Sequence, residues 1–268
     1  MNPRLRALEV LCLTDPADKV RQAQALHAAL LAADETGGAP IDLDVDTVHA
    51  EPNGLPGRPA LPRLVDAKRV PARTPFTLEG RCALLHAIAH IEFNAINLAL
   101  DAVWRFPGMP ASYYLDWLRV ASEEALHFSL LRNHLQGLGS DYGAFDAHDG
   151  LWLMTQRTAH DVTARMALVP RTLEARGLDA TPPLQAKFAR AGDERSVQIL
   201  DLILRDEIGH VAIGNHWYRW LCEREGADPL RRYAELAALH GAPRPRAPFN
   251  LAARRAAGFS DDELALLA

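Results

Sequence analysis

The feature that most constrains this chain is a pairing of an acid with an imidazole that occurs twice on helical stretches. Glu124 and His127 form one ExxH motif ("EEALHF"), and Glu207 and His210 form a second one ("EIGH"). At ~100° per residue, both residues of each motif fall inside an apolar stripe. Burying a carboxylate beside an imidazole costs free energy unless each has a partner. The fold must therefore supply a partner for both motifs in its core.

Each motif is preceded by a further glutamate at nearly equal spacing. Glu92 lies 32 residues before Glu124, and Glu174 lies 33 residues before Glu207. A turn is expected at "FPGMP", midway between Glu92 and Glu124, so an antiparallel helix pair would place these two acids at one level. The order Glu, ExxH, Glu, ExxH is the ligand pattern of four-helix bundles that bind two metal ions through carboxylates. Four carboxylates and two imidazoles match the needs of two divalent ions.

The ligand on the third helix of this pattern has two candidates. Glu174 follows Pro170, where a kink is expected, and precedes Gly177, where we expect the helix to end. Asp161 lies nearer the middle of the same helix, but ~140° around it from the face of Glu174. That face carries small and apolar residues. We prefer Glu174 and keep Asp161 as the alternative.

Other titratable residues near the motifs are assigned lesser roles. Asp101 lies opposite Glu92 on the first helix, which favours a solvated group or one that hydrogen-bonds a ligand. His86 and His90 form an i, i+4 pair but point away from the Glu92 stripe, which favours packing or hydrogen bonding. Glu123 and Asp206 each precede a ligand and face sideways, towards the surface or towards a ligand imidazole.

Helical periodicity predicts an all-α chain without a sheet. The long helices are expected over residues 78–106, from 111 to "GLGSDYG", over 148–177, and over 194–225. Short helices are expected at residues 4–32, divided near "TDPADK", at 230–239, and before residue 267. Residues 33–77 are rich in Pro and Gly and predict an extended arm, with a disordered linker as the alternative. The predicted domains are 1–76, 77–226 and 227–268.

Composition narrows the class of protein. A net charge of −5 and a pI near 6.1 give no electrostatic footprint for non-specific nucleic-acid binding. Cys12, Cys82 and Cys222 have no metal-type spacing and suit free thiols in a reducing compartment. The N-terminus has no apolar run of signal-peptide type, and the apolar stretches are shorter than the ~20 residues that span a bilayer. We expect a cytoplasmic protein with no membrane partner.

Several segments resemble a known family. "LLHAIAHIEFNAINLALDAVWRF", "EEALHFSLL", "RMALVPRTLEARGLD", "RDEIGHVAIGNHW" and "PFNLAARRAAGFS" are similar to the signature segments of the bacterial ferritin-like family called domain of unknown function 455. The resemblance covers nearly the whole chain. It implies a ferritin-like four-helix bundle with N-terminal helices, an arm and a helical tail, and it supports the dimetal site without naming a substrate.

The function expected from these residues is that of a non-haem diiron oxidase or oxygenase. Mn/Fe or Mn/Mn pairs would use the same ligands. We expect Glu92 and Glu174 to be mainly terminal ligands, Glu124 and Glu207 to bridge, and one imidazole to cap each ion. Because the chain has no CxxC pair, electrons would come from a separate reductase or a reducing substrate. The alternatives are a ferritin-like tRNA hydroxylase, a metal-handling protein without turnover, and a bundle whose acids only pair with core Arg.

Overall fold

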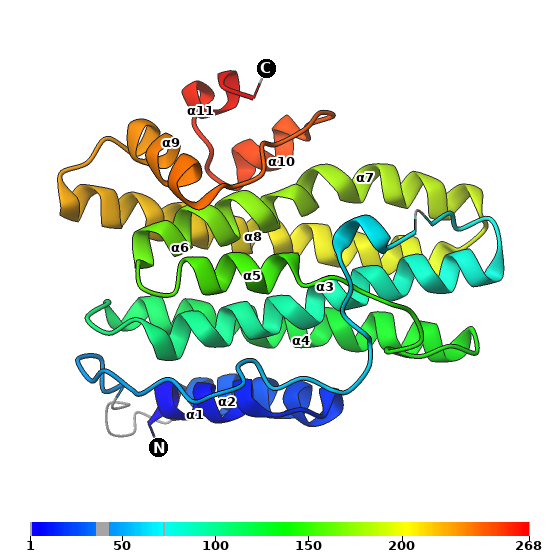
Figure 1. Cartoon of the computed structure of the whole chain (residues 1–268), viewed down its shortest axis with the longest axis horizontal. Coiled ribbons are helices and arrows are strands. Elements are labelled where there is room, and N and C mark those ends of the chain that lie inside the picture. Colours follow the sequence, from blue (N-terminus) through cyan, green and yellow to red (C-terminus); the bar gives the residue numbers. More distant parts are fainter. Residues whose placement is uncertain (1, 36–42, 72, 268) are drawn as a thin grey trace. The chain divides into compact units, whose positions relative to one another are not determined.

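The computed structural model describes residues 2–35, 43–71 and 73–267, and all regular structure in them is helical (Figure 1). No strand occurs in these residues, although an isolated β-bridge joins Leu64 to Ala147. The all-α prediction is therefore confirmed. The chain forms two compact units, residues 1–149 and 150–268, and each is described by itself. The three predicted domains divide the chain elsewhere and stay a prediction.

The centre of unit 1 is an antiparallel pair of long helices, α3 (Leu78–Arg105) and α4 (Ala111–Gly137). The hydroxyl of Thr77 caps α3 by accepting from the N–H of Gly80. The predicted turn lies between the helices, where Gly108 has a φ of 72° that favours glycine. Phe93 of α3 packs on Phe128 of α4, with ring centroids 5.3 Å apart. Both helices begin where the sequence predicts.

Helix α3 is buried around almost its whole circumference. Among the described residues, α3 alone is long and apolar enough to cross a membrane, with a mean hydropathy of 1.3 over its most apolar window. However, 83% of that window is buried inside the protein, as is usual for the core helix of a bundle. Burial in the protein core therefore accounts for the high hydropathy of α3.

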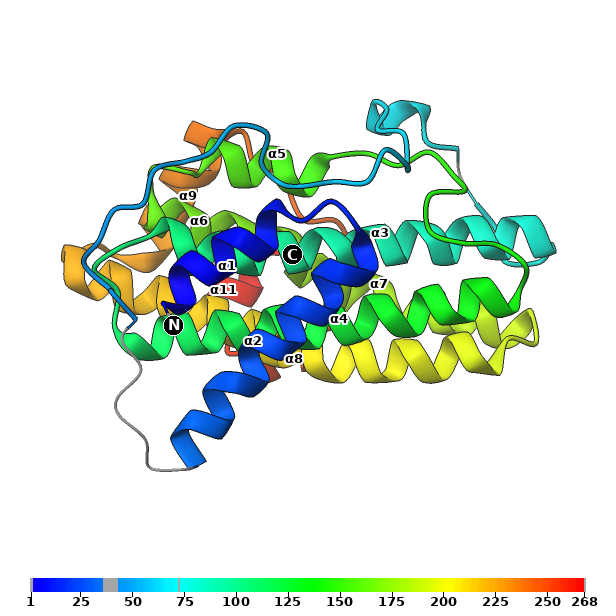
Figure 2. The ribbon, with the colours of Figure 1, turned by 90° about the horizontal axis from the view of Figure 1, so that it is seen from below.

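Two N-terminal helices cover this pair, α1 (Pro3–Cys12) against α3 and α2 (Pro16–Glu35) against α4 (Figure 2). The chain divides between them at "TDPADK", as predicted, and α2 begins at Pro16 within it. The buried ammonium of Lys19 on α2 donates to the carbonyls of Leu11 (3.0 Å) and Gly57 (2.7 Å) and to Oδ1 of Asn97 (2.6 Å). One side chain therefore ties α1, the arm and α3 together.

The first residues of the predicted arm, 33–35, belong to α2. From residue 43 on, its described residues are irregular, with several turns and one 3₁₀ turn, η1 (Ala67–Arg69). Buried Arg4 holds the beginning of this stretch, because its guanidinium donates to the carbonyls of Asp44 and Thr47 as well as to two carbonyls at the end of α3. Further along, Val65 donates to Ala147 (2.8 Å). The arm is thus fixed on unit 1. The part of the prediction that falls on residues 36–42 and on 72 lies outside the described residues.

Unit 2 is also helical, and its elements are α5 (Gly150–Arg157), α6 (Val162–Leu168), the π-helical segment η2 (Val169–Glu174), α7 (Ala175–Arg190), α8 (Glu194–Glu225), α9 (Pro229–His240), α10 (Leu251–Ala256) and α11 (Asp261–Ala265). The fourth long helix has the predicted bounds. In Figure 1, α7 and α8 lie side by side, and they pack on each other. The single short helix predicted for the end of the tail is two helices, α10 and α11.

The prediction of one helix over residues 148–177 is close at its start but wrong in its middle and at its C-terminal end. It is interrupted after α5, where Asp161 accepts from the N–H of Ala164 and starts α6. It also continues past Gly177 and through Pro182. A proline inside a helix leaves the carbonyl four residues earlier without its usual donor. Here that carbonyl belongs to Leu178, and the side-chain amide of Asn250 donates to it at 3.2 Å.

Pro170 is accommodated by the π-helical segment rather than by a simple kink. A π turn shifts the hydrogen-bonding pattern by one residue, which suits a segment whose proline lacks an N–H. The hydroxyl of Thr172 donates to the carbonyl of Ala167 at 2.8 Å and helps to satisfy the rearranged turn. Glu174 is the last residue of this segment.

Candidate metal centre

Unit 1 brings three of the predicted ligands together. Glu92 lies on α3, and Glu124 and His127 lie one turn apart on α4. Nδ1 of His127 is 3.2 Å from Oε2 of Glu124 and 3.4 Å from Oε2 of Glu92. Each residue offers a ligand atom, and these atoms all lie within 4.8 Å of one another. The predicted hairpin is therefore formed, with Glu92 level with the ExxH motif.

These three side chains are buried, and their electrostatics favour a cation. Glu92 is 6% exposed, Glu124 1% and His127 0%. Burial, and next the charge of Glu124, raise the pKa of Glu92 well above its ordinary value, while the hydrogen bond from His127 lowers it. A metal ion among these oxygens would favour the ionised carboxylates. Carboxylate oxygens with an imidazole nitrogen are a donor set that Fe, Mn and Zn accept, so the residues fit such an ion.

Unit 2 carries the second ExxH motif on α8 with the same local geometry. Nδ1 of His210 is 3.2 Å from Oε2 of Glu207, the same separation as in the first motif. His210 is 0% exposed and Glu207 8%. In both motifs Nδ1 faces the carboxylate, and a ring bound through Nδ1 would carry its proton on Nε2.

Two glycines establish how α8 packs against the segment that carries Glu174. A Cβ atom added to Gly214 of α8 would lie 2.6 Å from Cβ of Pro170, so glycine is required for this approach. A Cβ atom added to Gly177 of α7 would lie 3.4 Å from Oε1 of Glu207. Pro170 and Gly177 are seven residues apart, and so are Glu207 and Gly214, as expected for two antiparallel helical segments in contact.

This register places Glu174 level with His210 of α8. Glu174 also lies one turn before Gly177, on the side that approaches Glu207. It is 8% exposed. Asp161, the alternative, instead caps α6 and has a side chain that is 28% exposed. The register therefore indicates that Glu174 faces the ExxH motif of its unit, and Asp161 lies at a helix end.

The other candidate residues have local partners. His90 hydrogen-bonds Tyr142 and lies on the far side of α3 from Glu92, and His86 accepts from the N–H of Gly143. Their predicted role in packing and hydrogen bonding is confirmed. The expectation of a solvated Asp101 is wrong, because this side chain is fully buried and binds Arg105 at 2.8 Å.

The residues that flank the ligands also have partners. Asp206 accepts from its neighbour Arg205 at 2.9 Å, and Glu123 is half-buried beside the buried Glu124.

Sequence reasoning missed the two glycines that allow the close approach in unit 2. The local sequence indicates only a helix end at Gly177 and gives no role to Gly214. A signal was present, because a glycine inside a strongly helical pattern costs ~1 kcal/mol relative to Ala and suggests a packing reason. Gly214 lies one turn after His210 and two turns after Glu207, on the face that carries both.

The fold and the site together define an all-helical protein whose core holds buried carboxylate and imidazole clusters suited to metal ions. The chain belongs to the family described as "Protein of unknown function (DUF455)", whose model matches residues 12–265. It is 55% identical over 213 residues to an uncharacterized protein of Haemophilus influenzae, which covers 77% of this chain and 74% of that protein. No solved structure matches the chain.

Proposed function

We propose that this protein is a non-haem dimetal protein of ferritin-like type, with iron as the metal pair, and that it activates dioxygen to oxidise a substrate. The observation that carries the proposal is the buried group of Glu92, Glu124 and His127, in which the imidazole nitrogen lies within 3.4 Å of both carboxylates. A second ExxH motif with the same internal distance supports two ions rather than one.

The proposal assigns one set of ligands to each unit. Glu92, Glu124 and His127 would hold metal in unit 1, and Glu174, Glu207 and His210 would do so in unit 2. The doubled order Glu, ExxH, Glu, ExxH is the ligand pattern of proteins that bind a pair of ions. Bound in its reduced form, the pair would supply electrons to dioxygen. The chain would contribute charge balance through four carboxylates and a core from which water is excluded.

The reaction also needs electrons from outside the chain. The three cysteines are free and lie far apart in the sequence, so they form no CxxC redox pair. We propose a separate reductase or a reducing substrate as the electron donor. Free thiols suit a reducing compartment, and we propose a cytoplasmic location on that ground.

The first test is the metal content of the purified full-length protein by mass spectrometry, after expression in medium replete with iron and manganese. We expect about two ions per chain, with iron in the majority. Glu124→Gln and Glu207→Gln should each reduce this to about one ion or fewer, because each removes a charged ligand while keeping its shape. Glu123→Gln is the matched control and should retain about two.

Oxygen uptake by the ferrous protein is the second readout. We expect the iron-loaded native chain to consume dioxygen faster than either ligand variant does. Full loading of Glu124→Gln and Glu207→Gln would refute the site. A loaded native protein that consumes no dioxygen would refute the oxidase while leaving the metal site intact.

A further inference from the structure

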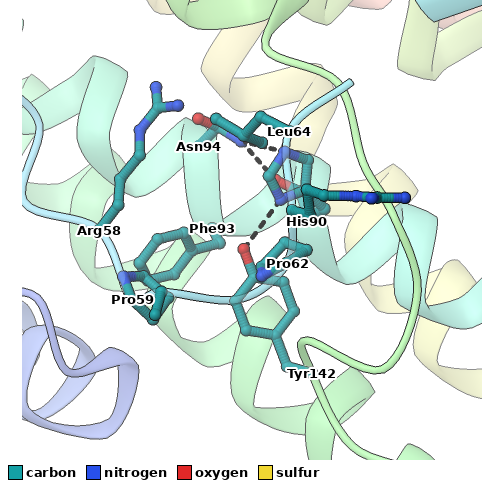
Figure 3. Close-up of a pocket in the computed structure, with 10 residues that line it drawn as sticks. Arg58, Pro59, Pro62, Leu64, His90, Phe93, Asn94 and Tyr142 are labelled. Atoms are coloured by element: carbon teal, nitrogen blue, oxygen red, sulfur yellow. Dashed lines mark hydrogen bonds between the residues drawn. The ribbon is translucent and has the colours of Figure 1, made fainter. Parts of the chain in front are cut away.

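A cavity of about 260 Å³ lies on the far side of α3 from Glu92, entirely within unit 1 (Figure 3). Its wall on the helix side comes from His90, Phe93 and Asn94, and its outer wall from the arm. At ~100° per residue, His90 and Asn94 lie ~160° around α3 from Glu92. The cavity is therefore separate from the candidate metal ligands. It is slightly smaller than the ~300–1,000 Å³ of typical drug-sized sites, so it suits a single ring with substituents.

The outer wall of the cavity is held in place at both ends. At one end the N–H of Gly57 donates to the carbonyl of Leu11 at 2.9 Å, and Lys19 donates to the carbonyl of Gly57. At the other end, Val65 and Arg63 exchange hydrogen bonds with Ala147, at 2.8 Å and 3.0 Å. The arm between these points carries two prolines that face the cavity. A wall pinned in this way makes the cavity preformed, as ligand sites usually are.

Two arginines line the cavity, Arg58 and Arg63, and Arg58 is the more buried of the two and has unused hydrogen-bonding capacity. Nη2 of Arg58 binds Oδ1 of Asp149 at 2.6 Å, and its side chain is 21% exposed. Its Nε and Nη1 atoms make no hydrogen bond with any described residue. A guanidinium offers its donors in a planar fork that matches a carboxylate. Arg58 therefore has donors left for an anion in the cavity.

The cavity also presents one acceptor without a partner. Asn94 is 2% exposed, and its Nδ2 donates to the carbonyl of His90 at 2.9 Å. Because a carbonyl oxygen accepts, the amide atom beside it is the nitrogen, Nδ2. Oδ1 is therefore the amide atom that remains without a partner. Oδ1 makes no hydrogen bond within the described part of the chain. An open acceptor in the cavity wall favours a ligand that brings an N–H or O–H donor.

The remaining walls are mainly flat and apolar, apart from the largely exposed Arg63, which pairs with Asp146 at 2.6 Å. The rings of Phe93 and Tyr142 lie 5.4 Å apart, and Pro59 and Pro62 face them from the arm (Figure 3). His90 holds the Tyr142 hydroxyl at 2.8 Å. Such walls suit a planar ring, which packs well against aromatic and proline faces.

From these walls and polar groups we propose that the cavity binds a small aromatic carboxylate that also carries a hydroxyl group. The carboxylate would bind the guanidinium of Arg58, the ring would lie among Phe93, Tyr142 and the two prolines, and the hydroxyl would donate to Oδ1 of Asn94. The site is independent of the metal centre, and its test does not require a loaded metal.

Binding to the full-length protein should be measured by titration calorimetry and ligand-observed NMR with three probes. 4-Hydroxybenzoate carries all the proposed features, benzoate lacks the hydroxyl, and 4-hydroxybenzamide lacks the charge. We expect 4-hydroxybenzoate to bind with a Kd of ~0.1–1 mM, which is reasonable for ten non-hydrogen atoms. Benzoate and the amide should each bind at least about fivefold more weakly, because each leaves one polar group unpaired.

Variants of the protein locate the site. Arg58→Gln should weaken 4-hydroxybenzoate binding by about tenfold or more, the effect of losing a charge-assisted hydrogen bond. Arg21→Gln removes the same charge from an exposed arginine of α2 and should leave binding unchanged. Ala60→Phe introduces a ring at an exposed arm position that lines the cavity and should block all three probes.

Three results would overturn the proposal. One is that none of the probes binds the native chain at ~5 mM, well above the expected Kd. Another is equal affinity of the native chain and a folded Arg58→Gln variant. The third is undiminished binding to a folded Ala60→Phe variant, which would place the probes elsewhere. Circular dichroism of each variant establishes that it is folded.

Discussion

At the scale of single residues, Lys19 connects three parts of unit 1, namely α1, the arm and α3. It is fully buried, and it donates to two backbone carbonyls and to the side chain of Asn97. Burial lowers the pKa of this ammonium to about 7, far below the ~10.4 of an unfolded chain. Between these values the unfolded chain binds a proton that the folded chain has released. The free energy of unfolding therefore rises with pH over this window and is lower at neutral pH.

We predict that raising the pH from 7 to 9.5 increases the free energy of unfolding by roughly 2–3 kcal/mol through Lys19 alone. The measurement is urea unfolding of the full chain at several pH values. Lys19→Met should be less stable at every pH, since it leaves three acceptors without a donor. It should also lack this part of the pH dependence. Lys68→Met, at an exposed position of the arm, is the control. Parallel pH profiles for the native chain and Lys19→Met would contradict the argument.

At the scale of elements, the contact between α8 and η2 depends on Gly214. Alanine is favoured over glycine in a helix by ~1 kcal/mol, so propensity alone predicts that Gly214→Ala stabilises the protein. However, the added methyl would lie 2.6 Å from Cβ of Pro170, and such overpacking typically costs ~1–3 kcal/mol. We predict that packing dominates and that the melting temperature falls by about 2–6 °C.

The control for this substitution lies on the same helix. Gly209 has nothing within 4 Å of an added Cβ, so Gly209→Ala should raise the melting temperature slightly. Scanning calorimetry of the two variants and the native chain makes the comparison. If both variants are equally stabilised, the contact at Pro170 is not as close as described.

Some features of the helices could be predicted from the sequence, and others could not. The bounds of α3, α4 and α8 follow from apolar periodicity and from Pro and Gly at their ends, which are local signals. The continuation of α7 through Pro182 depends on Asn250, which is remote in the sequence and binds the freed carbonyl. No local pattern contains that information. The π turn at Pro170 is hidden for the same reason.

The ligands of the candidate site were predictable because the pattern is repeated. One ExxH motif is weak, but its recurrence with a preceding glutamate predicted that Glu92 lies level with Glu124 and His127. In the sequence, only the character of the helix face favours Glu174 over Asp161. The register of α8 against the π turn, fixed by Gly177 and Gly214, supplies the stronger argument, and it depends on tertiary contacts.

At the scale of the whole molecule, the tail is part of the fold and not an appendage. Arg171 of the π segment is buried and pairs with Glu263 of α11, and its guanidinium lies 4.7 Å from the ring centroid of Tyr233 and 5.1 Å from that of Phe259. Glu263 also accepts from Arg219 at 2.9 Å. Arg171 precedes Glu174 by three residues, so the tail holds the segment that carries a candidate ligand.

We predict that Arg171→Met or Glu263→Gln lowers the free energy of unfolding by roughly 3 kcal/mol, because each leaves a buried partner unpaired. The double variant should lose less than the sum of the two, since the residues are coupled. Urea unfolding of the four proteins gives the coupling. Arg255→Met, which breaks the exposed pair with Asp261, should cost less than about 1 kcal/mol. Additive losses in the double variant would show that the pair is not coupled.

The burial of α3 on nearly every side has a consequence for how such chains are recognised in genomes. By length and hydropathy, this helix resembles a membrane span. A short series of polar residues along its length distinguishes it from one. Each has a separate partner: Glu92 meets His127, Asn94 binds His90, Asn97 accepts from Lys19, and Asp101 pairs with Arg105. The polar residues that mark α3 as the core helix of a bundle are thus the ones that attach it to the candidate metal site, the cavity, the N-terminal helices and its own end.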